Sequence, residues 1–518
     1  SLAMLNMLLH NMPEAEIKLG DTLNAPQFIQ LGNLQTFNYC VANPPFSTKG
    51  WLAGTGDDQY HRWRPDYMPP AKNGDYAFLL HLIASMKPGI GKGACILPHG
   101  VLFRGNAEEV IRTDLVKNKR VIEGIIGLPA NIFFGTGIPA SIIVLNNSRT
   151  AQGIFFIDAS EGYVKDGNKN RLREQDIRKI VDVYNARLEI PHYSRFVPLA
   201  EIEANGYNLN IPRYIEPIDR EETQDLDGHL NGGISKAELE AIGHWQNFDG
   251  LWQTLLKECR PGYYSLNIQP SEVFATIADT DSVKMRKHET TELLSGWEAF
   301  AREAFGKLDG TAKSMIESLA CQMRDTFNAS SVMDCYDAFG VFMDYALDAL
   351  QDDMFAIYGD SWLVARELEK ELDKKDKLKS WDGMLIPKQL VKQEFFATEL
   401  TKVNALQQKA EEAQGALEQF IQECADLGDD DPLSEIKDDD KIASDADCKK
   451  VVRKLKTDAE RKAEAEAIQK YLDLRAMVSS ANKAYKEADA SLDAEAMKRY
   501  PLLTEEEIRL RPTVSPSM

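Results

Sequence analysis

The stretch of this 518-residue sequence with the most evident chemistry is Asn43-Pro44-Pro45-Phe46, within FNYCVANPPFSTKGW. It directly follows an apolar run that predicts a buried strand. The Asn43 side-chain oxygen can accept a hydrogen bond, and so can the Pro44 carbonyl, which is held by the fixed dihedral angles of the prolines. Two acceptors that bind the hydrogens of one exocyclic amino group withdraw its nitrogen lone pair from conjugation with the ring, as the nitrogen begins to bond to a carbon atom. The stretch therefore predicts a site that makes a ring amine nucleophilic.

Phe46 adds a flat aromatic face on which an extruded base can stack. A strong general base is not required, because an amine that attacks a sulfonium methyl group can lose its proton after the new bond forms. Catalysis would then rest on orientation and on preorganised acceptors. The tetrapeptide alone is weak evidence, since any strand can end in a proline turn. Its position is informative, because ligands of open α/β sheets bind beyond the carboxyl ends of the strands.

The elements that must position this site are predicted by alternating apolar runs and helical patterns in residues 1–150, which are typical of a doubly wound α/β sheet. Asn106 is the predicted N-cap of one helix. The sheet region closes near residues 205–217, where two prolines break the regular pattern. Strands are predicted at 37–44, 93–103, 121–129, 141–147 and 153–160, and helices at 75–89, 106–118 and 171–188.

The remainder of the chain has a different pattern. Residues 246–380 are predicted to be mostly helical, with aromatic residues spaced for core packing. From residue 393 onward, apolar or small residues recur in steps of four and three, which indicates a coiled-coil-like hairpin whose second helix covers about 448–490. We therefore expect a partial catalytic domain at 1–220, a mainly helical region at 221–392, and a hairpin with a tail at 393–518. The predicted seam is Leu406, Ala410, Ala413, Leu417, Phe420, Cys424 and Leu427.

The net charge of −21 is unevenly distributed. Lys and Arg number 23 against 22 Asp and Glu in residues 1–220, but 37 against 59 in residues 221–518. A DNA-facing first half therefore stays open, although no strong basic patch is visible there. The seven cysteines lack a C-x-x-C spacing, which favours free thiols in a reducing compartment. Because the sequence contains neither a long apolar run nor a signal peptide, we expect a soluble cytoplasmic protein that does not bind a membrane.

The order of several segments resembles the methylation subunit of type I restriction-modification systems, within the N-6 adenine-specific DNA methyltransferase family. The resemblance implies a Rossmann-like sheet, S-adenosylmethionine as methyl donor and DNA as substrate, with Asn43 to Phe46 holding a flipped-out adenine. Implied partners are a specificity subunit, a second methylation subunit and, in systems that have one, a restriction subunit with nuclease or translocase activity. The matching segments are LNMLLHN, LGDTL, VANPPFSTKGW, DYAFLLHLIASMKPGIGKGACILPHGVLFRG, EEVIRTDLV, IIGLPANIFFGTGIPASIIVLNN, FIDAS, RPGYYSL, SWDGMLIP and YPLLTEEEI.

By the same resemblance, Asp21 of GDTL matches the position that binds the adenine ring of the cofactor. The alternative is that Asp21 is a turn residue after a short strand. The glycine-rich turn and the acid-ended strand of the family are not found before Asn43. The segments AGTGDD and GIGKG follow the catalytic strand, where a cofactor loop cannot lie in this topology, and are predicted to be ordinary loops.

Because the glycine-rich turn and the acid-ended strand are not found, we expect that the chain begins inside the helix that follows that strand in the family. We also expect that it stops shortly after YPLLTEEEI. Its sheet would lack the first strands and would leave an unpaired edge and half a cofactor pocket. We therefore predict that the chain alone binds S-adenosylmethionine weakly or not at all, and that it is inactive by itself.

Two other functions stay open. The α/β region could be a noncatalytic scaffold, with the helical hairpin docking a specificity subunit. A protein-glutamine methyltransferase could use the same acceptors, although Phe46 and the large helical C-terminal region make it less favoured. No metal is predicted, since the histidines lack ligand spacing. His81 and His99 are predicted to be packing or surface residues, and Trp51 and Trp63 to serve either DNA contact or loop packing.

Overall fold

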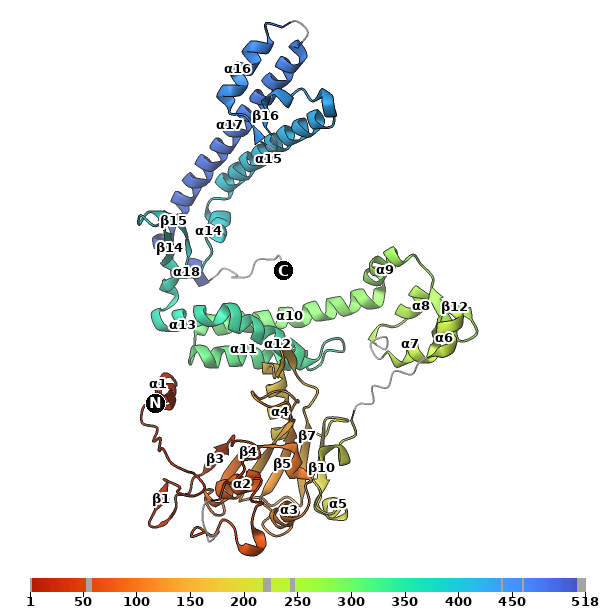
Figure 1. Cartoon of the computed structure of the whole chain (residues 1–518), viewed down its shortest axis with the longest axis vertical. Coiled ribbons are helices and arrows are strands. Elements are labelled where there is room, and N and C mark those ends of the chain that lie inside the picture. Colours follow the sequence, from red (N-terminus) through yellow and green to blue (C-terminus); the bar gives the residue numbers. More distant parts are fainter. Residues whose placement is uncertain are drawn as a thin grey trace. The chain divides into compact units, whose positions relative to one another are not determined.

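The computed structural model describes residues 2–52, 58–217, 225–242, 247–438, 441–458 and 461–509 (Figure 1). The chain divides into two compact units. The first consists of Ser1–Ala299 and Ser318–Tyr345, and the second of Phe300–Glu317 and Ala346–Met518. Within the described ranges, no helix is long and apolar enough to cross a membrane.

The first unit contains a six-stranded mixed sheet with strand order β10-β7-β5-β6-β4-β3 (Figure 1). Pairing is parallel between β3 and β4 and between β5 and β7, and antiparallel at the other contacts. An α/β sheet is observed as predicted, but it is mixed, and the edge strand β10 was not predicted from its short, proline-ended sequence. The strands are β3 (Tyr39–Ala42), β4 (Lys92–Pro98), β5 (Ile122–Gly127), β6 (Ala140–Asn146), β7 (Gly153–Asp158) and β10 (Ser194–Pro198).

Helices cover both faces of this sheet, which makes three layers. On one face, α2 (Asp75–Ala84), α3 (Ala107–Lys117) and α5 (Leu199–Ala204) contribute to the main core. On the other face, α4 (Glu174–Ala186) packs its Ile180 and Val183 in a core with Phe155. Phe156 belongs to the first core, because successive side chains of a strand point to opposite faces. Asn106 does precede α3, but its φ of 57° places its side chain outside capping geometry, and it makes no cap hydrogen bond.

The remaining elements up to residue 345 belong to the first unit, except that α10 (Asp281–Lys307) and α11 (Ala312–Phe327) belong partly to the second. The predicted helical pattern after residue 246 was wrong in part, because a small sheet of order β11-β13-β12 lies here and its strands are too short and polar to show a period. The elements are α1 (Leu2–Leu9), β1 (Ile29–Gln30), β2 (Asn33–Leu34), β8 (Val164–Asp166), β9 (Lys169–Arg171), α6 (Leu226–Asn231), β11 (Ile234–Ser235), α7 (Lys236–Ala241), α8 (Leu251–Leu255), β12 (Leu256–Arg260), β13 (Tyr263–Leu266), α9 (Val273–Asp279), α10 (Asp281–Lys307), α11 (Ala312–Phe327) and α12 (Cys335–Tyr345).

The second unit contains two long helices, α15 and α17, which form the legs of a hairpin (Figure 1). Of the predicted seam, Leu417, Phe420 and Cys424 lie in the core of this hairpin, whereas Leu427 is 58% exposed and lies outside it. The second predicted helix is observed as two, α16 and α17, and a strand pair β14-β15 interrupts the region predicted to be helical. The elements are α13 (Gln351–Asp360), β14 (Leu368–Leu372), β15 (Leu378–Gly383), α14 (Lys388–Phe395), α15 (Ala397–Ala425), β16 (Lys437–Asp438), β17 (Lys441–Ile442), α16 (Asp445–Leu455), α17 (Lys462–Arg499) and α18 (Glu505–Arg509).

Candidate active site

The Asn43-Pro44-Pro45-Phe46 segment leaves the sheet at the carboxyl end of β3. The last residue of β3, Ala42, is paired in parallel with Cys95 of β4, so both strands point toward the same edge of the sheet. Asn43 and Pro45 are exposed, Pro44 is buried and Phe46 is half-buried. The segment therefore lies where a ligand of an α/β sheet is expected, with its amide side chain in contact with solvent.

The two predicted acceptors have no partner within the part of the chain that the structure describes. No described group donates a hydrogen bond to the Asn43 side-chain oxygen or to the Pro44 carbonyl. The exposed Asn43 oxygen can bind water and exchange it for the amino group of a ligand, whereas Pro44 is buried and its carbonyl is left for a bound donor. The arrangement is consistent with the predicted role of both residues.

The buried carboxylate of Asp75, the first residue of α2, holds the segment that follows these acceptors. The Ser47 backbone N–H donates to Asp75 Oδ1 over 2.7 Å, and Arg104 Nη1 donates to Asp75 Oδ2 over 3.0 Å. Asp75 is 0% exposed, and Ser47 has a left-handed φ of 52°. The charge-assisted hydrogen bond from Ser47 fixes this turn, because breaking it would leave the buried Oδ1 of Asp75 without this donor. Asp75 thus fixes the turn directly after Phe46.

Phe46 is oriented by an aromatic contact. Its ring meets Phe133 at a centroid distance of 5.7 Å and an interplanar angle of 80°, an edge-to-face geometry. Phe133 belongs to the loop between β5 and β6, and its neighbour Phe134 is 94% exposed. The predicted stacking ring is therefore supported by a second loop at the same end of the sheet.

Asp21 forms a local turn, which was the alternative to a cofactor role. Its Oδ1 accepts hydrogen bonds from the backbone N–H groups of Leu23 and Asn24, both over 3.0 Å, and its Oδ2 accepts from Asn24 Nδ2 over 2.9 Å. These hydrogen bonds, with that from the Asn24 backbone foremost, lower the pKa of Asp21. A carboxylate offers about four acceptor positions, so Oδ2 can still accept another donor.

A small cavity borders Asp21. Its volume is about 160 Å³, and Lys18, Phe28, Phe37 and His81 are among the residues that line it. The Lys18 ammonium group lies 4.6 Å from the centre of the Phe28 ring. Pockets that enclose a whole ligand of drug size measure roughly 300–1,000 Å³, so this cavity can receive only part of one.

Arg62 joins the Asp21 turn to the loop after β3 and to α2. Its guanidinium donates to the Leu23 carbonyl over 2.7 Å, to Asp58 Oδ1 over 2.9 Å, and from Nη1 to His81 Nδ1 over 3.0 Å. The Arg62 and Asp58 side chains are 3% and 2% exposed. Burial alone would raise the pKa of Asp58, but its hydrogen bonds from Arg62 outweigh that effect and lower it. The ion pair thus fixes three segments that lie far apart in the sequence.

His81 is held neutral in this arrangement. Burial, assisted by the neighbouring Arg62 charge, lowers its pKa from 6.5 to about 4. A neutral imidazole is required here, because Nδ1 accepts a hydrogen bond from Arg62. The prediction that His81 is a packing residue is consistent with this position.

We expect His81 to make the first unit sensitive to mild acid. Because the folded state binds the His81 proton less tightly than the unfolded state, its contribution to stability is complete above pH 6.5 and is lost as the pH falls toward 4. The expected loss in unfolding free energy is about 3 kcal/mol. Urea unfolding at several pH values would measure it.

A His81→Gln variant keeps a neutral acceptor and should show a flatter pH dependence between pH 7 and 4. The exposed His61 offers a matched control, and His61→Gln should keep the wild-type dependence. Equal pH dependence in His81→Gln and wild type would contradict this assignment.

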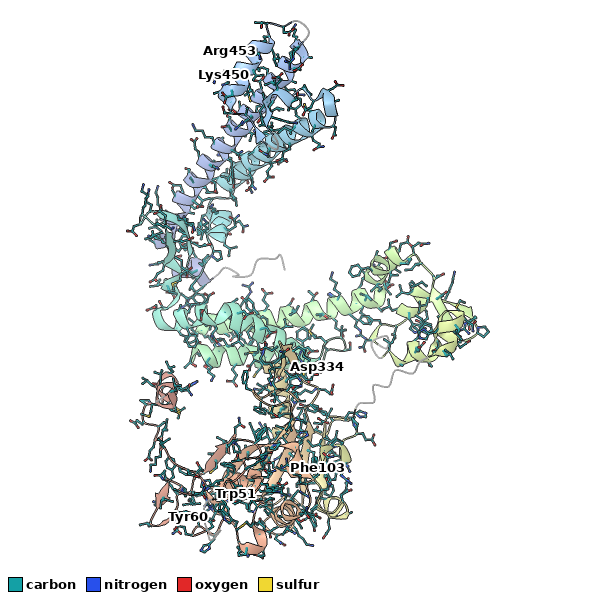
Figure 2. All side chains as sticks on the ribbon, viewed as in Figure 1. Trp51, Tyr60, Phe103, Asp334, Lys450 and Arg453 are labelled. Atoms are coloured by element: carbon teal, nitrogen blue, oxygen red, sulfur yellow. The ribbon has the colours of Figure 1, made fainter. Side chains whose placement is uncertain are left out.

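Of the two functions weighed for Trp51 and Trp63, loop packing agrees with the structure. Both side chains are 4% exposed, and their rings meet edge-to-face at 5.1 Å (Figure 2 labels Trp51). Trp51 Nε1 donates to the Pro70 carbonyl over 2.9 Å. Arg62 lies 4.2 Å from the Trp63 ring, so the pair belongs to the scaffold around the ion pair.

The predicted loops and the metal prediction can be compared with the structure. GIGKG covers the turn before β4, where Gly89 has a φ of +75°, and the first two residues of β4. Of AGTGDD, all but the final Asp58 lies outside the described residues. Within the described ranges, no group of three or more His, Cys, Asp or Glu residues could hold a metal ion. Asp75 and Arg62 were not singled out from the sequence, because nothing local marks a carboxylate at a helix start or an arginine in a loop as buried.

Comparison with known proteins finds a matching family for the first part of the chain. The family model described as N-6 DNA Methylase matches residues 1–223. That region contains Asn43, Asp75 and Arg62.

Curated relatives confirm the resemblance to type I methylation subunits. The type I restriction enzyme MjaVII methylase subunit of Methanocaldococcus jannaschii is 36% identical over 259 residues, 46% of this chain and 43% of the relative. The MpnII methylase subunit of Mycoplasma pneumoniae is 30% identical over 44% of this chain and 43% of its own. The HindI methylase subunit of Haemophilus influenzae is 32% identical over 43% of this chain and 52% of its own length. The matches thus span about half or less of each relative.

Solved structures of similar proteins also match in part. The type I restriction-modification methyltransferase subunit from Streptococcus thermophilus is 41% identical and covers 42% of this chain and 46% of its own, with a TM-score of 0.39. The M protein of type I restriction enzyme EcoKI is 24% identical, and the match covers 35% of this chain and 38% of the M protein, with a TM-score of 0.28.

Proposed function

We propose that this chain carries the target-base site of a type I restriction-modification DNA adenine N-6 methyltransferase, with DNA as substrate. The observation that carries the proposal is the pair of acceptors, Asn43 and Pro44, which have no hydrogen-bond partner among the described residues and lie in a segment held by buried Asp75. The N-6 DNA methylase match over residues 1–223 supports it. The partners proposed are those implied by the relatives: a specificity subunit, a second methylation subunit and, where present, a restriction subunit.

The chemistry follows from the two acceptors. When bound, S-adenosylmethionine supplies a sulfonium methyl group. The Asn43 side-chain oxygen and the Pro44 carbonyl accept the two amino hydrogens of a flipped-out adenine, which keeps its N6 lone pair directed at the methyl carbon. With the cofactor bound, the N6–carbon bond would form as the carbon–sulfur bond broke, and the extra proton on N6 would leave to solvent. Phe46, fixed by Phe133, stacks on the base.

The residues present fit one end of the cofactor. The Oδ2 atom of Asp21 retains acceptor capacity beside the small cavity, so it can accept a hydrogen bond from a bound donor. The cavity is too small to enclose the whole molecule. We therefore propose that another polypeptide segment completes the cofactor pocket.

The edge of the sheet beside this site supports that proposal. Among the described residues, β3 pairs only with β4, and its Tyr39 and Val41 are 76% and 83% exposed. Helix α1 exposes Leu2 and Leu9 by 86% and 77%. Apolar residues on an open strand edge favour pairing with a further strand. We call the chain combined with this further segment and the specificity subunit the reconstituted enzyme.

The chain alone is expected to bind S-adenosylmethionine poorly. Because only part of the ligand can be enclosed, calorimetric titration should show no saturation below about 1 mM. A binding control is the reconstituted enzyme, which should saturate at lower concentration. Micromolar affinity in the isolated chain would refute the proposed half-pocket.

The test of the function is methyl transfer by the reconstituted enzyme to unmethylated DNA. Labelled methyl groups should appear on adenine N6, and the signal should depend on Asn43. Transfer to a protein glutamine instead of DNA would favour the glutamine methyltransferase alternative. No methyl transfer by the reconstituted enzyme would favour the noncatalytic assembly scaffold, whereas DNA methylation that persists undiminished in Asn43→Ala would refute the proposed role of Asn43.

A further inference from the structure

A strongly basic surface lies on α16, at the end of the hairpin away from β14 and β15 (Figure 2 labels Lys450 and Arg453). Residues 449–456 contain five basic side chains and no acidic one, whereas residues 221–518 as a whole contain 37 basic and 59 acidic residues. We call these five the α16 basic face. Its members are Lys449, Lys450, Arg453, Lys454 and Lys456, and all are exposed.

The opposite side of α16 explains why the charges share one face. Cys448, Val452 and Leu455 are buried in the hairpin core. At about 100° per residue, the five basic positions span an arc of roughly 160°, centred away from the three buried residues. With a rise of about 1.5 Å per residue, the face is about 10 Å long. Packing of the apolar side therefore forces the cations outward together.

The nearby acidic residues do not neutralise this face. Asp431 pairs with Lys437, Glu435 with Arg461, and Asp445 with Arg475. Asp447 pairs with Lys450 at 2.8 Å, but the Lys450 side chain remains 75% exposed. Within the described ranges, no ion pair involves the other four members of the face. A concentrated positive charge thus remains in an otherwise acidic half of the chain.

We propose that the α16 basic face binds the phosphate backbone of duplex DNA, an inference that rests on the proposed DNA substrate. Four or five cations on a face about 10 Å long match the dense negative charge of a duplex, in which both strands together carry one charge per about 1.7 Å. Flexible lysines contact phosphates without reading bases, so this contact is independent of sequence. The target-base site reads one adenine, and the α16 basic face adds affinity.

The test compares DNA binding by the full chain and by a variant with four charges removed, Lys449→Gln, Lys450→Gln, Arg453→Gln and Lys454→Gln. Fluorescence anisotropy with a labelled duplex of about 30 base pairs, from about 50 to 200 mM salt, gives affinity and salt dependence. The variant should bind about 10-fold or more weakly, with a slope of log K against log salt shallower by about 2 to 4. The buried side of α16 is unchanged, and circular dichroism checks its helix.

A matched control removes the same charge elsewhere in the second unit. Lys370, Lys374, Lys375 and Lys377 are exposed on and near the β14–β15 turn, among acidic neighbours, and their replacement by Gln should leave DNA affinity within about twofold. Equal losses in the two variants would show an effect of net charge alone and would overturn the proposal. Unchanged DNA binding by the α16 variant would also overturn the proposal. This holds even if the variant no longer bound an acidic protein partner, because the face would then be a protein-binding surface.

Methyl transfer at saturating DNA distinguishes this inference from the proposed function. The α16 variant in the reconstituted enzyme should keep the wild-type maximal rate, because its changes lie outside the target-base site. Absent methyl transfer in wild type, with DNA binding still lost in the variant, would refute the methyltransferase proposal and support the α16 basic face.

Discussion

Replacing Asn43 by alanine is expected to reduce the rate of methyl transfer by the reconstituted enzyme about 100- to 1,000-fold. The side-chain oxygen is one of two preorganised acceptors, and loss of one such group typically costs this factor. Because Asn43 is exposed and makes no hydrogen bond within the described residues, the substitution should leave unfolding free energy nearly unchanged. Single-turnover transfer of labelled methyl groups to DNA measures the effect.

Two companion variants make the Asn43 result specific. Asn38 is an exposed asparagine just before the same strand, and Asn38→Ala should keep wild-type activity. Asn43→Asp retains a side-chain oxygen acceptor and should lose less activity than Asn43→Ala. If Asn43→Ala remained within about threefold of wild type, the acceptor role of this residue would be wrong.

Replacing Arg62 by methionine is expected to destabilise the first unit by about 3 to 5 kcal/mol. The change leaves the Asp58 carboxylate buried without its partner and removes the donors to the Leu23 carbonyl and His81. Loss of one member of a buried ion pair typically costs this much, because the remaining charge is desolvated and uncompensated. Urea unfolding at pH 7, followed by tryptophan fluorescence, measures the effect, since Trp63 lies against the Arg62 guanidinium.

The surface pair of Arg171 and Asp166 is the matched control. Their side chains are 63% and 67% exposed at a separation of 3.6 Å, so Arg171→Met should cost less than about 0.5 kcal/mol. The double variant Asp58→Asn with Arg62→Met removes the stranded charge and should be more stable than Arg62→Met alone. An Arg62→Met protein as stable as Arg171→Met would show that the buried pair does not hold these segments.

Substitution of Arg62 is expected to affect cofactor binding more than the transfer step. Arg62 does not touch the proposed adenine site, but it holds the Leu23 carbonyl and hence the turn that contains Asp21. In the reconstituted enzyme we expect a conservative Arg62→Lys variant to weaken cofactor binding more than it slows transfer at saturating cofactor, because a lysine cannot bridge three acceptors with a planar fork.

Much of the fold followed from local pattern. The five predicted strands are all present, and β4 to β7 are buried, as their apolar runs indicate. The prediction that the strand before Asn43 is buried was wrong, because β3 lies at the edge of the sheet and exposes Tyr39 and Val41. The strand pairs β12-β13 and β14-β15 lie where a mostly helical pattern was predicted, since their stability comes from pairing between segments rather than from a period in one segment. The prediction that Leu427 ends the heptad seam was wrong, because α15 already ends at Ala425.

The sequence by itself determined the chemical identity of the site: an amide, two prolines and an aromatic ring after an apolar strand, in segments that resemble type I methylation subunits. Only the tertiary structure decided what holds that site. Asp75 secures the Ser47 turn, Phe133 orients Phe46, and Arg62 joins the Asp21 turn to Asp58 and His81. The reason is physical: a hydrogen bond, an ion pair or a ring contact between distant residues depends on burial and distance, which exist only once the chain has folded.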